Sequence, residues 1–125
     1  MVLHPRQTYV HLAQDGKAQT LPGDSFWQLP ASEMAHYGKG WLISEYECSR
    51  DWPTWEMHPE GDEFVYLLSG AVDLLLEQDG GIVSTSLQGA GAVVVPRGTW
   101  HTAKVRQPSR MLHVTRGAGT QHRPA

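Results

Sequence analysis

Short runs in which apolar and polar residues alternate recur along the chain, and each run is bounded by Gly, Pro or Asp. Successive side chains of an extended strand point to opposite faces, so this period of two indicates strands with one buried face. Runs that recur roughly every 8 to 12 residues between turn residues are typical of an antiparallel sandwich or barrel. The pattern predicts strands over residues 8–12, 40–48, 54–58, 63–69, 71–77, 82–87, 92–95, 101–105 and 110–116.

Helix signals are nearly absent, and turn residues separate the strands. One segment, 31–37, lies between a proline and a glycine, which predicts at most one short helix. Asp79 and Gly80 predict a tight hairpin, because such pairs supply the positive φ that the turn requires. Gly70 interrupts two strands with little room for a loop, so the chain is expected to kink there. Residues 96–98 (Pro-Arg-Gly) predict a further tight turn.

Length and composition favour a single domain. At 125 residues the chain is long enough for one hydrophobic core and short for two. We expect an N-terminal arm over 1–39, a barrel over about 40–116 and a flexible tail over 118–125, where Gly and polar residues offer little to pack. An open sheet needs its edge strands covered, and the arm of a second copy could cover one, so a homodimer is expected.

Charge and hydropathy exclude several classes of protein. The formal net charge is -3 without any basic stripe, so nucleic acid is not an expected partner. No apolar run approaches the ~20 residues of a membrane helix, and the N-terminus lacks a signal-peptide core, which predicts a cytoplasmic protein without a membrane partner. The single cysteine, Cys48, excludes an internal disulfide and a Cys-based zinc site, and its alternating run predicts a small buried hydrophobe.

Candidate metal ligands gather in and after the segment WEMHPEGDE, residues 55–63. If this segment begins as a strand, Glu56 and His58 project from the same face. A Pro/Gly turn follows, and Glu63 opens the next strand, where it can return beside them. A further donor must come from a distant part of the sequence, and His101 begins a strand directly after a tight Pro/Gly turn.

At this point the sequence resembles the cupin family, which carries two metal-binding motifs in this order. The matching stretches are Glu56-x-His58-x4-Glu63-x6-Gly70 and Pro96-x-Gly98-x2-His101. The resemblance covers residues 40–115. It implies an all-β double-stranded β-helix, or jelly-roll barrel, that holds a divalent transition metal (Fe, Mn, Ni or Zn) and a small-molecule ligand or substrate. The implied metal ligands are Glu56, His58, Glu63 and His101.

Two positions depart from the family pattern: Glu56 stands where the family has its first histidine, and Val105 replaces its final asparagine. If Glu56 ligates, two carboxylates neutralise a divalent metal, which becomes a weaker Lewis acid than in the usual cupin site. If Glu56 turns away, His58, Glu63 and His101 remain, and two histidines with one carboxylate suit non-haem iron. Both alternatives favour a first-row metal over magnesium or calcium.

Other residues are placed by their position on the strands. His113 shares a face with its neighbours two residues away on the last strand, so it is a candidate for the pocket lining. In 40–48, either the odd-numbered or the even-numbered residues line the barrel, and the sequence leaves this open. Trp55 and Trp100 each adjoin a candidate ligand and therefore lie on the opposite face, as core or dimer contacts. Residues with no identifiable partner, expected at the surface or in local hydrogen bonds, are His4, His11, His36, His122, Glu60 and Asp62.

These patterns favour a metal-binding cupin that acts on a small-molecule metabolite. An oxygenase-type reaction on a small organic acid or similar metabolite is the function expected first, and a metal-dependent isomerase is the other enzyme considered; the catalytic residues stay unknown. The alternative is a non-enzymatic cupin module that binds or senses a small ligand. A purely structural barrel without metal is a third reading, and the three intact donors His58, Glu63 and His101 argue against it.

Overall fold

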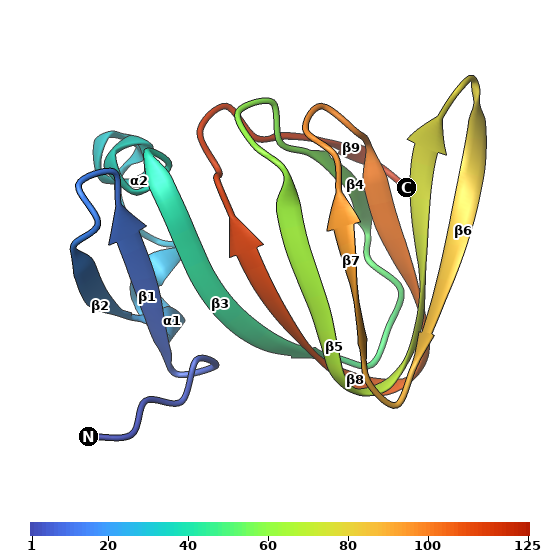
Figure 1. Ribbon diagram of the computed structural model, residues 1–125, viewed down its shortest axis with the longest axis horizontal. Helices are drawn as coiled ribbons and strands as arrows, with labels where there is room; N and C mark the ends of the chain where they lie inside the picture. Colours follow the sequence, from blue (N-terminus) through green and yellow to red (C-terminus); the bar gives the residue numbers. More distant parts are fainter.

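Nine β-strands and two short helices make up the chain (Figure 1). The computed structural model describes residues 1–125. Every strand pair is antiparallel, which confirms the all-β prediction. The elements are β1 (Thr8–Ala13), β2 (Ala18–Pro22), α1 (Gly23–Phe26), α2 (Ala31–Tyr37), β3 (Gly40–Cys48), β4 (Thr54–Met57), β5 (Glu63–Gln78), β6 (Gly81–Gln88), β7 (Gly91–Val95), β8 (His101–Thr115) and β9 (Gln121–Pro124).

Two long strands, β5 and β8, run through both halves of the barrel. The first part of β5 pairs with β7 and the second part with β6, while β8 pairs with β5 along both parts. The sequence pattern predicts two shorter strands in place of each. The alternation of apolar and polar residues breaks locally, and such a break does not show whether strand pairing continues beyond it. Register shifts between Leu67 and Ala71 bend β5 without ending it. Both strands curve round one end of the fold in Figure 1.

Gly70 permits this bend. Its φ is 100°, a region that favours glycine, and a Cβ there would lie 2.3 Å from the Oγ of Ser109 on β8. The Ser109 hydroxyl accepts a hydrogen bond from the backbone N–H of Ala71 at 3.1 Å. The predicted kink is therefore confirmed, and its cause is the close approach of two backbones. The predicted hairpin is also present, with φ of 52° at Asp79 and 77° at Gly80.

The main core lies inside the barrel and is built mainly from the inward residues of β5 and β8, with single residues from β6, β7 and the segment before β4. These residues alternate with exposed or half-buried ones, as the period of two predicts. Cys48 packs at the edge of this core, as expected. Burial raises the pKa of its thiol, so the group stays neutral. The core consists of Trp52, Val65, Leu67, Val72, Leu74, Leu76, Leu87, Val95, Ala103 and Met111.

Residues 1–39 pack against the barrel of their own chain. β1 pairs with β3, with Val10 opposite Ile43, and β2 forms a hairpin with β1 at the left of Figure 1. The expected arm thus covers a sheet edge within the chain, and homodimer formation stays a prediction. The helix α2 has the predicted bounds, whereas the single turn α1 carries no helix signal in the sequence. Neither helix is long and apolar enough to cross a membrane.

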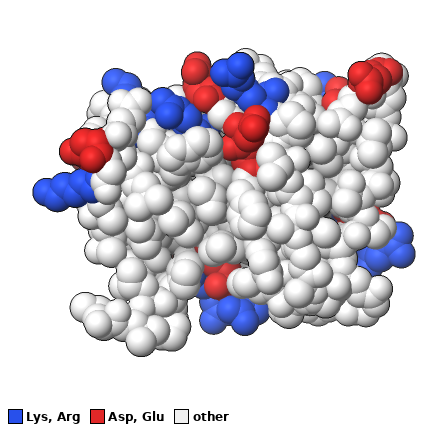
Figure 2. Space-filling view, viewed as in Figure 1, with Lys and Arg blue, Asp and Glu red and all other residues white.

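An apolar row crosses the outer face of the sheet. Phe64 of β5 is 38% exposed and Val94 of β7 is 57% exposed, and the two lie opposite each other. In Figure 2 the charged side chains lie mostly round the outline and leave the centre of the face white. This row is apolar area that a second copy could bury. Its members, in register from β1 to β7, are Val10, Ile43, Val114, Phe64 and Val94.

The C-terminal residues form a strand, so the prediction of a flexible tail over 118–125 is wrong. β9 pairs with β4, with Thr54 opposite Pro124. The guanidinium of Arg123 lies 4.4 Å from the ring centroid of Trp100 and 5.3 Å from that of Trp55, and it forms an ion pair with Glu77. These cation–π contacts dock a segment whose own sequence carries little apolar surface. Trp55 and Trp100 thus lie away from the ligands, as expected, but they contact β9.

Replacing Gly70 by alanine should destabilise the fold by at least ~2 kcal/mol, because the methyl group meets Ser109 in addition to straining φ. Gly80→Ala is the matched control, since its φ is 77° but a Cβ would have nothing within 4 Å. There only the backbone cost of about 1 kcal/mol should appear. Urea unfolding curves measure both free energies, and equal losses in the two variants would contradict the packing explanation.

Candidate metal centre

The loops that carry the candidate ligands are tied together by backbone hydrogen bonds. The N–H of Gly98 donates to the carbonyl of His58 at 2.9 Å, and the N–H of Arg97 donates to Oδ1 of Asp62 at 2.8 Å. Asp62 is exposed, as expected, but it also joins the two loops. The predicted turn over 96–98 is therefore present, with φ of 77° at Gly98.

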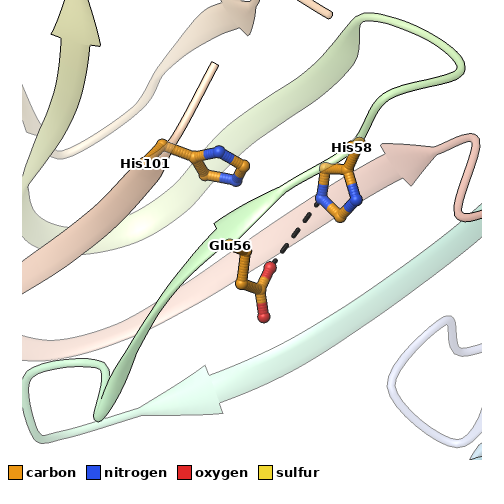
Figure 3. A group of neighbouring side chains, drawn as sticks. All are labelled: Glu56, His58 and His101. Atoms are coloured by element: carbon orange, nitrogen blue, oxygen red, sulfur yellow. Dashed lines mark ion pairs between the residues drawn. The ribbon is translucent and has the colours of Figure 1, made fainter. Parts of the chain in front are cut away.

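Strand pairing brings the four predicted ligands to one place. Glu56 lies opposite His101 in the register of β4 and β8, and Glu63 begins β5 beside them. The Nε2 of His58 lies 3.3 Å from Oε2 of Glu63 and 3.8 Å from Oε2 of Glu56. The Nε2 of His101 lies 3.1 Å from Oε1 of Glu63. Figure 3 shows Glu56, His58 and His101, whose donor atoms lie within 4.8 Å of one another.

Both histidines present a free lone pair to this place. The Nδ1–H of His101 donates to the carbonyl of Thr99 at 3.0 Å, so its Nε2 carries the lone pair when the ring is neutral. The hydroxyl of Thr120 donates to the carbonyl of Gly117, so it accepts from the Nδ1–H of His58 at 2.8 Å. The Nε2 of His58 is likewise left as an acceptor. Holding one ring nitrogen so that the other can ligate is the usual arrangement at metal-binding histidines.

The buried donor atoms have no hydrogen-bond partners. Nε2 of His58, Nε2 of His101 and Oε1 of Glu63 are all buried and unpaired, and their close contacts lack hydrogen-bond geometry. Buried polar atoms are nearly always paired, so three orphans that face one another need an explanation. A cation among them would satisfy all three. The residues present therefore fit a divalent transition metal.

The electrostatics of Glu63 and His101 also fit a cation. Burial alone would raise the pKa of Glu63, but the neighbouring imidazoles of His101, His113 and His58 outweigh it and hold that pKa well below its usual range. Burial alone would lower the pKa of His101, but the Glu63 carboxylate outweighs it and raises that pKa. Glu63 is therefore a carboxylate with only 3% of its surface exposed. A buried negative charge of this kind favours a positive partner.

His113 joins this cluster, which confirms that it lines the pocket. Its Nδ1 lies 3.6 Å from Oε2 of Glu63, and its ring stacks on Tyr46 with centroids 4.7 Å apart and planes at 9°. The Thr115 hydroxyl donates to Oε2 of Glu63 at 2.5 Å. The alternation along β8 had indicated this face. For β3 the structure decides what the sequence left open, since the even-numbered Leu42, Ser44 and Tyr46 line the pocket.

Two site residues come from the C-terminal segment, and sequence reasoning missed both. Thr120 holds His58, and Nε2 of His122 lies 3.5 Å from Oε1 of Glu56. Glu56 therefore lies between His58 and His122, with its side chain 31% exposed. The i, i+2 spacing of Thr120 and His122 was a signal for a strand, but a segment rich in Gly and polar residues obscured it. Of the other histidines, His4 is exposed, whereas His11 is buried outside this site.

Comparisons with known proteins identify the fold. No family model and no curated protein matches the sequence. Among solved structures, recombinant oxalate oxidase in complex with glycolate aligns over 65% of this chain and 45% of that chain, at 14% identity and a TM-score of 0.55. Oxalate decarboxylase from Lactobacillus farciminis, as a formate complex, aligns over 67% of this chain and 26% of that chain, at 15% identity and a TM-score of 0.56. Both are cupins. This chain has the cupin fold.

A third neighbour extends the range of activities on the same fold. Hydroquinone 1,2-dioxygenase, solved with Cd²⁺ and 4-hydroxybenzonitrile, aligns over 60% of this chain and 56% of that chain, at 15% identity and a TM-score of 0.51. This chain spans less than two thirds of each of these three proteins. Structural similarity at such low sequence identity supports a shared fold but does not assign an activity.

The cupin barrel encloses a cavity of about 450 Å³ that opens from the candidate metal centre. One end is polar and is lined by three of the four candidate ligands, Glu56, His58 and Glu63. The other end is apolar and is lined by residues of the N-terminal segment. The lining residues are Tyr9, Phe26, Trp27, Met34, Tyr37, Gly38, Leu42, Ser44, Tyr46, Glu56, His58, Glu63, His113, Thr115, Gly117, Thr120 and His122.

Glu63→Gln should lower the pKa of His101 below the ordinary imidazole value of about 6.5, because burial remains while the carboxylate charge is lost. An NMR pH titration of the imidazole resonances in metal-free protein measures this. Glu56→Gln is the control: Glu56 is the weakest of the influences that raise this pKa, so the shift should be small. A pKa of His101 that is unchanged in Glu63→Gln would contradict the assigned cause.

Proposed function

We propose that this cupin binds one divalent transition metal (Fe, Mn, Ni or Zn) through Glu56, His58, Glu63 and His101 and acts on a small molecule in the adjoining cavity. The observation that carries the proposal is the set of three buried, unpaired donor atoms that face one another. Imidazole nitrogen and carboxylate oxygen together suit first-row transition metals rather than magnesium or calcium.

The position of Glu56 favours the four-residue site over the three-residue one. Its carboxylate is 3.8 Å from Nε2 of His58 and belongs to the group of donors within 4.8 Å. With Glu63 it brings two negative charges, which neutralise a divalent metal. His122, 3.5 Å away, orients Glu56 from the solvent side. The site thus differs in charge from a cupin site with three histidines and one carboxylate.

A metal bound here would supply Lewis-acid or redox chemistry to an adjacent substrate. The surrounding residues position its ligands: Thr120 holds His58, the Thr99 carbonyl holds His101, and Thr115 holds Glu63. Burial, and after it the charge of Glu56, raise the pKa of Tyr46 well above its ordinary value. The Tyr46 phenol therefore keeps its proton and can donate a hydrogen bond to a substrate oxygen.

An oxygenase-type reaction is the activity that we propose for this site. Three neighbours of the same fold are an oxalate oxidase, an oxalate decarboxylase and a hydroquinone 1,2-dioxygenase, and two of these are oxidative enzymes. His58, His101 and Glu63 supply the two histidines and one carboxylate typical of non-haem iron oxygenases, and Glu56 adds a second carboxylate beside them. Oxygen uptake by iron-loaded protein, screened against small metabolites, tests the activity separately from metal binding. Ligand binding without turnover would favour a binding or sensing module instead.

His58→Ala and His101→Ala should each lose bound metal while the fold is retained. Each substitution removes a buried donor whose partner atoms lie on separate strands, so the remaining donors hold the ion poorly. Elemental analysis after dialysis measures metal content, and circular dichroism measures the fold. His4→Ala, at an exposed histidine, is the control and should keep its metal. Stoichiometric metal in the His58/His101 double variant would refute the site.

Glu56→Gln should weaken metal binding by about tenfold or more, the low end of what loss of a supporting or ligating group costs. Competition with a fluorescent chelator measures the affinity. Glu56→His restores the usual cupin residue and should retain the metal with one more positive charge at the site. If Glu56→Ala leaves the affinity unchanged, the three-residue site of His58, Glu63 and His101 is correct.

A further inference from the structure

The apolar end of the cavity is an aromatic wall built by residues outside the two metal-binding motifs. Tyr9, Phe26, Trp27 and Tyr37 all come from the segment 1–39. Their rings pack edge to face: the centroids of Tyr9 and Phe26 are 5.6 Å apart, and those of Phe26 and Trp27 are 4.9 Å apart. Rings in this arrangement present faces and edges to which another aromatic ring packs favourably.

Trp27 stands at the opening of the cavity. It lines the cavity although 63% of its surface is exposed, and few large apolar residues of this protein are so exposed. Its Nε1–H donates to the hydroxyl of Tyr9 at 3.3 Å, which holds the indole against the wall. An indole ring held in contact with water has an unfavourable hydration free energy, which is relieved when another apolar group covers the ring. A ligand in the cavity would cover it.

The charges in the cavity select against anions. None of the residues that line it is Lys or Arg, and Glu56 and Glu63 are both acidic. With a divalent metal bound, those two carboxylates leave no net positive charge at the polar end. A small dicarboxylate would therefore meet neither an Arg clamp nor a charged lysine, the groups that usually bind such anions. From the sequence a small organic acid or a similar metabolite is expected, and the charges of the cavity argue against the acid.

We propose that the ligand of this cupin is an uncharged aromatic compound that carries a hydroxyl group. Its ring packs against Phe26 and Trp27, and its hydroxyl reaches the polar end beside Tyr46. A cavity of about 450 Å³ lies in the lower part of the range for ligand sites, which suits one or two rings. The inference rests on the proposed metal function only for the hydroxyl end, because the aromatic wall is independent of the metal ligands.

Isothermal titration of chelator-stripped and of Zn²⁺-loaded protein with three probes tests the inference. The probes are 2-naphthol, its fully saturated counterpart decahydro-2-naphthol, and oxalate. We expect 2-naphthol to bind both forms of the protein and to bind about tenfold more tightly than the saturated alcohol, the size of an aromatic packing contribution. Oxalate should bind the Zn²⁺-loaded protein more weakly than 2-naphthol does.

Trp27→Ala should weaken 2-naphthol binding about tenfold without loss of metal, because Trp27 is exposed and its ring packs on Tyr9 and Phe26. Trp41→Ala is the control by residue type, since Trp41 does not line the cavity, and it should bind 2-naphthol as the parent does. Unchanged affinity in Trp27→Ala, or equal affinity for the aromatic and saturated alcohols, would overturn the inference.

The two proposals fail in distinguishable ways. If the protein holds Zn²⁺ but binds oxalate more tightly than 2-naphthol, the aromatic ligand is wrong and the metal site stands. If no metal binds while 2-naphthol binding still depends on Trp27, the metal function is wrong and the aromatic ligand stands.

Discussion

The buried carboxylate of Glu63 is the constraint on which the rest of the site depends. A charge with 3% exposure is costly unless it is compensated. Here three imidazoles surround the carboxylate and the Thr115 hydroxyl donates to Oε2, while Oε1 has no hydrogen bond. Those partners come from β8 and from the end of β4, so the barrel must close before the charge is compensated. The same closure leaves Nε2 of His58 and Nε2 of His101 unpaired. Buried polar groups without partners lower the stability of the fold, and a bound cation would pair them.

Strand register determines which of these side chains lie together. Glu56 lies opposite His101, and backbone hydrogen bonds join Gly98 to His58 and Arg97 to Asp62. Because side chains alternate with a period of two, a slip of one residue in β4 would turn Glu56 away from the centre. The docking of β9 adds a further restraint, since it places Thr120 on His58.

The two ends of the cavity have different origins. The barrel and its C-terminal strand supply the polar end, and the segment 1–39 supplies the aromatic wall through α1, α2 and β1. Neighbours with the same barrel and different activities agree with this division, because the shared part of a fold does not set the substrate. In this chain the apolar part of the cavity is therefore built mainly by residues outside the barrel.

The sequence by itself determined the period-two strands, the bounds of β3 and α2 and the Gly70 kink, and it singled out the four side chains that the structure brings together, Glu56, His58, Glu63 and His101. These features depend on local alternation, on turn residues and on fixed spacings, all of which are readable along the chain. Only the tertiary structure decided that β5 and β8 continue through their breaks and which face of β3 lines the cavity. It also decided that His122 and Thr120 reach the site. Those outcomes depend on long-range contacts, such as Arg123 against Trp55 and Trp100, whose energy has no signature in the local sequence.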